Sequence, residues 1–172
     1  MDVTSRLPAL LTALAIVALG ATVRADGEPR PEGTRDPVVA SVLRAIDRMV
    51  KNPIVDQVRP EYPQVFNFAE RSDQVLVTIS TRYLEFSGDK KLDSALIAYF
   101  IAGAVKFDLE NPEAREDELA DIPAAIRSAL VYYRAHRSHH PERSHPFFER
   151  MDEHDRAGTL DQYVAEAAKR AD

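Results

Sequence analysis

Cysteine is missing from all 172 residues of the sequence. The chain therefore cannot form a disulfide bond, and it offers no thiolate as a nucleophile or metal ligand. It also has no CxxCH motif for covalent attachment of haem. A domain folded from this sequence must be held together by packing and hydrogen bonds, and any metal site must use nitrogen and oxygen ligands.

Basic residues are outnumbered by acidic ones. The chain has 22 lysines and arginines against 28 aspartates and glutamates, a formal net charge of −6. Without residues 1–25, which are considered next, 20 basic and 27 acidic residues remain, a net charge of −7. Such a domain has no general electrostatic attraction for nucleic acid or anionic lipid, so we expect no nucleic-acid partner.

The N-terminal region lacks an apolar run long enough to span a bilayer. The run Leu10–Leu19, LLTALAIVAL, is uncharged but short. It follows Arg6 and precedes the small residue Ala25, as in a secretory signal peptide. We predict that residues 1–25 are a signal peptide cleaved after Ala25, that the protein is exported to the periplasm or beyond the cell, and that no membrane span remains. An uncleaved anchor is the alternative.

The rest of the chain has the apolar spacing of helices. Residues 26–36, DGEPRPEGTRD, read as a flexible mature N-terminus. Asp36-Pro37 is a favourable helix start, and apolar residues at helical spacing follow it. The uncharged run Ser94–Val105 predicts a buried central helix over Leu92–Leu109, in which Gly103 lets a neighbouring helix approach closely. We predict an all-α fold for residues 37–172: a single compact domain of five or six helices.

Three stretches are harder to interpret. Residues 53–71 contain three prolines and no clean period, so we read them as a connecting segment. Residues 74–86 fit both a strand and a helix, and we predict a helix because no partner strand is evident. Residues 108–121 form an acidic connection, and Asp121 is expected to cap a helix that starts at Ile122.

All five histidines lie between His136 and His154. Residues 136 and 140 would be one helical turn apart on one face, which lets two imidazoles meet one ion. The predicted metal ligands, for a zinc, copper or nickel ion, are His136, His140, His145 and His154. The competing interpretation is a solvated loop whose positive groups, including His139, favour the helix C-terminus.

No motif indicates catalysis, and we assign no catalytic residue and no organic cofactor. GxSxG and HExxH are absent, and the acidic stretch 108–121 has no glycine for a calcium loop. The adjacent aromatics Phe147 and Phe148 could supply an exposed contact, although burial of both is the favoured interpretation. The sequence predicts a non-catalytic binding or interaction protein of the cell envelope, with an unknown protein or small-molecule partner. The alternative is a metal-binding protein that uses the segment His136–His154.

Overall fold

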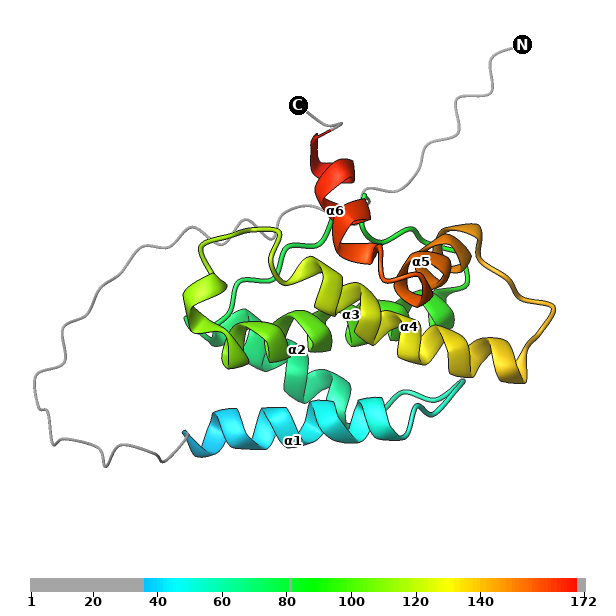
Figure 1. The fold of residues 1–172 in the computed structure, drawn as a ribbon. Coiled ribbons are helices and arrows are strands. Elements are labelled where there is room, and N and C mark those ends of the chain that lie inside the picture. The colour runs from blue at the N-terminus through cyan, green and yellow to red at the C-terminus, as the bar shows by residue number, and fades with distance from the viewer. Residues whose placement is uncertain (1–35, 81, 170–172) are drawn as a thin grey trace, which may run out of the picture. The chain divides into compact units, whose positions relative to one another are not determined.

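The computed structural model describes residues 36–80 and 82–169. These residues form one compact unit of six α-helices with a short 3-10 helix, and they contain no β-strand (Figure 1). The all-α prediction is therefore confirmed for this part of the chain. The predicted signal peptide and residues 26–35 lie outside the described residues. The elements are α1 (Pro37–Lys51), α2 (Glu61–Arg71), α3 (Lys90–Glu110), η1 (Pro112–Ala114), α4 (Ile122–His139), α5 (Pro146–Arg156) and α6 (Leu160–Lys169).

Helix α1 begins where the sequence predicts. The Asp36 carboxylate accepts a hydrogen bond of 2.8 Å from the Val38 backbone N–H, and Pro37 occupies the first helical position. That position needs no N–H donor, so proline costs nothing there. The buried face of α1 carries Val39, Val42, Leu43, Ala45, Ile46 and Met49.

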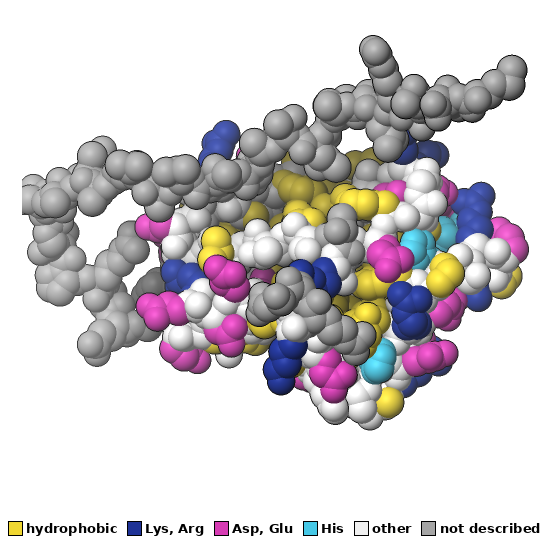
Figure 2. All heavy atoms as spheres, turned by 90° about the horizontal axis from the view of Figure 1, so that it is seen from above, with side chains coloured by type: hydrophobic (Ala, Val, Ile, Leu, Met, Phe, Trp, Pro, Cys, Tyr) yellow, Lys and Arg dark blue, Asp and Glu magenta, His cyan; other side chains and the backbone are white. Residues whose placement is uncertain are grey.

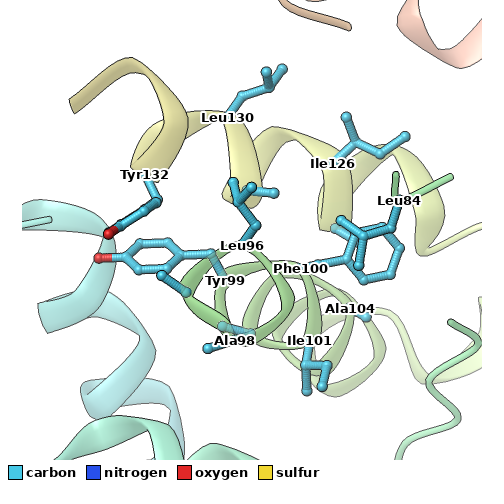
Figure 3. Packing of buried hydrophobic residues seen from close by; sticks show 14 of the residues in the cluster. Leu84, Leu96, Ala98, Tyr99, Phe100, Ile101, Ala104, Ile126, Leu130 and Tyr132 are labelled. Atoms are coloured by element: carbon cyan, nitrogen blue, oxygen red, sulfur yellow. The ribbon is translucent and has the colours of Figure 1, made fainter. Parts of the chain in front are cut away.

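Helix α3 is the centre of the core, as predicted. It is buried around most of its circumference and packs along α4. Figure 3 shows Leu96 facing α4, whereas Ala98 and Ile101 point to the opposite side of α3. A helix covered on several faces needs apolar side chains all round, which explains the uncharged run in its sequence.

Residues 53–71 correct one prediction, because half of them form helix α2. Pro63 lies in its first turn, where backbone N–H groups have no partner inside the helix, so the helix tolerates it. Tyr62 and Val65 face the core one turn apart, and Phe68 and Ala69 pack behind them. The three prolines of this stretch made the helical spacing of its apolar residues difficult to recognise in the sequence.

Residues 74–86 correct a second prediction, since their described part contains neither helix nor strand. One hydrogen bond to a distant side chain and two within a local turn take the place of a regular backbone pattern here. The Leu76 N–H donates to the Asp108 carboxylate at 2.8 Å, and the Tyr83 and Leu84 N–H groups donate to the Ser80 carbonyl. The segment still contributes Val75, Tyr83 and Leu84 to the core.

Asp121 occupies the N-cap position of α4, as predicted, but the expected capping by its side chain is absent. Its side chain makes no capping hydrogen bond, and the residue is buried with Oδ2 unpaired. Phe147 and Phe148 are both buried, as favoured above, and stack edge to face with ring centroids 5.2 Å apart.

The surface of the domain is mixed in charge. Figure 2 shows acidic and basic side chains interspersed over the face that it presents, with apolar side chains visible between them. Among the described residues, no helix combines the length and apolar character needed to cross a bilayer.

Candidate metal centre

Two of the four predicted metal ligands lie together at the end of α4. His136 is in the last turn of the helix and His140 is its C-terminal cap, so one helical turn separates them. Their ring centroids are 4.9 Å apart. The His136 side chain is buried and its ring lies over Tyr132, with centroids 6.3 Å apart. The local helix geometry therefore positions this pair as the spacing predicted.

The third member is Asp56, which no sequence pattern indicated. Its Oδ2 lies 2.7 Å from Nε2 of His140. Among residues 36–80 and 82–169, Asp56, His136 and His140 are the one group of three in which each offers a ligand atom within 4.8 Å of the others. The signal was weak because 80 residues separate Asp56 from His136, and a single aspartate in a turn is common.

Asp56 is held in place by the turn between α1 and α2. Its backbone φ of 62° is left-handed, a conformation that aspartate adopts more readily than most residues. Arg59 fastens the same turn, since its guanidinium donates to the Asn52 carbonyl and to the Glu61 carboxylate. The Arg59–Glu61 pair is buried, so the turn is anchored to the core rather than left in solvent.

The surroundings of His136 and Asp56 favour the protonation states in which these side chains bind a metal ion. Burial, followed by the nearby His140, lowers the pKa of His136, which keeps the ring neutral at neutral pH. The hydrogen bond from His140 lowers the pKa of Asp56, which keeps the carboxylate ionised. A neutral imidazole and an ionised carboxylate are the states in which these groups coordinate a metal. In addition, His136 Nδ1 is buried and has no hydrogen-bond partner among the described residues.

The ligand atoms lie within 4.8 Å of one another, so small movements would bring them to the spacing of a coordination sphere. Ligand atoms about 2.1 Å from a tetrahedral zinc ion lie about 3.4 Å from one another. Asp56 and His140 must therefore separate by about 0.7 Å from their 2.7 Å contact, whereas ligand atoms as far apart as the 4.8 Å limit of the group must approach by about 1.4 Å. A side-chain rotation suffices for the first movement, because the Asp56 side chain is half exposed. Three protein ligands leave one coordination position for water or another ligand.

His145 and His154 have other partners. The ring of His145 meets the edge of Phe148, and its backbone N–H donates to the Tyr133 hydroxyl. His154 shares a 2.9 Å hydrogen bond with the Thr159 hydroxyl and lies against the ring of Tyr163. Neither belongs to the group around Asp56, and the metal assignment of all four histidines stays a prediction.

Two of the acids beside His154, Asp152 and Asp155, are also engaged elsewhere. Arg134 donates to Asp152 and Asp155 at 2.6 Å each, and Arg156 pairs with Asp152. These two carboxylates are therefore not free oxygen ligands, and their pairs with Arg134 join α4 to α5. The fifth histidine, His139, is exposed on α4.

Comparison of the chain with protein-family models, with curated proteins and with solved structures found no match in any of the three. The arguments for its function therefore rest on its own residues.

Proposed function

We propose that this protein is a non-catalytic helical binding protein whose ligand is a divalent transition-metal ion, held by Asp56, His136 and His140. The observation that carries the proposal is the convergence of these three side chains, two of which come from one helix end and one from a distant turn. The candidate ions are Zn²⁺, Cu²⁺ and Ni²⁺, because two imidazoles and one carboxylate suit them better than they suit Mg²⁺ or Ca²⁺.

Export belongs to the same proposal. If residues 1–25 are removed, the metal site faces the periplasm or the exterior, where a protein without cysteine has no thiols to lose to oxidation. Mass spectrometry of the mature protein should then find an N-terminus at or near Asp26. A major species that begins at Met1 would refute the export proposal and leave the metal site untouched.

Titration calorimetry of the metal-free full chain with Zn²⁺, Cu²⁺ and Ni²⁺ tests the site. We expect one ion per chain. His136→Ala combined with His140→Ala should abolish that binding, and Asp56→Asn should weaken it about tenfold or more, because the charged ligand is lost. The matched control is His139→Ala, which removes a histidine of the same helix that is not in the group.

Two outcomes would contradict the proposal. One is a wild-type chain that takes up metal only weakly and without fixed stoichiometry. The other is a tight isotherm that the double replacement leaves unchanged, which would place the ion elsewhere. In the first case, the Asp56–His140 contact serves only to hold the α1–α2 turn against α4.

A further inference from the structure

A cavity lies beside the metal centre, between the α1–α2 turn, α2, α3 and α4. Its volume is about 660 Å³, which is in the range of small-molecule sites. Tyr62, Ala95 and Ile97 form part of its wall, and Tyr132 separates it from His136. We infer that this cavity binds an anionic amphiphile, a free carboxylate with a single unbranched apolar tail.

The apolar part of the cavity continues onto the surface. Val58 is 86% exposed and Phe66 is 37% exposed, and both line the cavity. Exposed apolar side chains at the mouth of an apolar cavity are what a hydrocarbon tail would cover.

The charge at the mouth determines the class of ligand. Lys90 and Lys91 line the cavity and have no ion pair within the described part of the chain, and Ser94 exposes a hydroxyl on the same side. The carboxylate that lines the cavity, Asp56, is already bonded to His140. The unpaired charges at this opening are therefore positive, although the protein as a whole is acidic.

The two lysines lie at the end of their helix that disfavours positive charge. They occupy the first turn of α3, and positive charge is unfavourable at the positive end of a helix dipole. They are also adjacent, so they repel each other. The two acids of this helix start, Asp89 and Asp93, offset only part of that cost, because their carboxylates accept hydrogen bonds from backbone N–H groups. A carboxylate between the two ammonium groups removes both penalties.

Calorimetry of the full chain with octanoate, decanoate and dodecanoate below their micelle concentrations tests the inference. We expect saturable one-to-one binding that strengthens about fourfold per buried methylene. Decanol, which has the same tail without the charge, should bind about tenfold more weakly. Decyltrimethylammonium should not compete with decanoate.

Three variants distinguish the contribution of the apolar tail to binding from that of the carboxylate charge. Lys90→Gln with Lys91→Gln should remove the preference for decanoate over decanol. The matched control, Lys51→Gln with Lys169→Gln, makes the same change of charge outside the cavity and should leave it intact. Ser94→Trp, at an exposed position of the cavity wall, should fill the space and abolish binding while circular dichroism reports an unchanged helical fold.

Decanoate binding is measured with chelator present, where no ion is bound beside Asp56, so the failure of the metal proposal and the failure of this one are distinguishable. Absence of saturable binding, equal affinity for decanoate and decanol, or full binding by Ser94→Trp would each overturn the inference. Vesicles of anionic phospholipid form a separate arm of the experiment. Binding to vesicles without binding to free carboxylates would replace the small-molecule ligand by a membrane surface and also overturn it.

Discussion

Gly103 of α3 lies directly against the backbone of Ala124 in α4. A Cβ atom at Gly103 would be 2.5 Å from the Ala124 carbonyl oxygen and 2.7 Å from Cβ of Ser128. Both distances are shorter than van der Waals contact, so the two helices approach as closely as they do because position 103 carries no side chain.

Gly103→Ala should therefore destabilise the protein by roughly 1–3 kcal/mol, and Gly103→Leu by more, because the two helices must move apart. This loss outweighs the gain in helix propensity from glycine to alanine, which is about 1 kcal/mol. Urea unfolding measures the effect. Ser94→Ala on the exposed side of α3 is the control and should be nearly neutral. An unchanged midpoint for Gly103→Leu would contradict the packing described here.

Asp121 should make stability depend on pH in an unusual direction. Burial, followed by the nearby charges of Asp108 and Asp117, raises the pKa of Asp121 from 3.8 to about 7. Between these values the folded state holds a proton that the unfolded state has released. The stability contributed by this group is therefore complete below about pH 4 and is lost as the pH rises through about 7, a change of about 2–4 kcal/mol.

Asp121→Asn should remove its own contribution to that slope and leave that of Asp108, whose pKa burial also raises. The variant should unfold at higher urea than the wild type at pH 8 and at a similar concentration at pH 4, because asparagine stays neutral at both values. Glu116→Gln, an exposed acid of the same connection, is the control and should leave the slope unchanged. Destabilisation of the protein by Asp121→Asn at pH 8 would instead mean that the ionised carboxylate makes a stabilising contact.

Arg134 should be important for the attachment of α5. It donates to Asp152 and Asp155 at 2.6 Å each, and the Asp152 side chain is only 10% exposed. Arg134→Ala leaves that carboxylate with less compensation, and we expect a loss of roughly 1–3 kcal/mol together with faster hydrogen exchange in α5. Arg150→Ala, which removes a 3.5 Å pair between half-exposed groups, should cost about 0–1 kcal/mol. Equal effects of the two variants would show that burial of the acid is unimportant.

His136 should titrate below an ordinary histidine. Burial is the largest cause of its lowered pKa, the nearby His140 adds to it, and Asp56 opposes it. Asp56→Asn should therefore lower the pKa of His136 further, which NMR titration of the ring protons measures. Because the folded pKa is lowered, His136 contributes stability at neutral pH that is lost as the pH falls below about 6.5. A His136 pKa above 6.5 would mean that the ring is better solvated, or more strongly paired with Asp56, than its position indicates.

The sequence alone determined the features that depend on neighbours within one or two turns. Asp36 and Pro37 start α1, and the uncharged run around Gly103 makes α3 the central helix, because caps and apolar spacing act locally. The approach of His136 to His140 is likewise a property of one helix, since residues four apart share a face.

The tertiary structure alone decided which distant groups meet. Asp56 contacts His140 because the Arg59–Glu61 ion pair stabilises the α1–α2 turn. Neither contact produces a periodic pattern in the sequence. The described part of residues 74–86 joins α2 to α3 without regular structure, and its Leu76 N–H donates to the distant Asp108 carboxylate. Asp121 is buried rather than capping, and His154 packs on Tyr163 rather than near His136, because the docking of whole helices sets the environment of each side chain. These contacts join residues far apart in the chain, and burial and charge pairing between them are settled only when the core assembles.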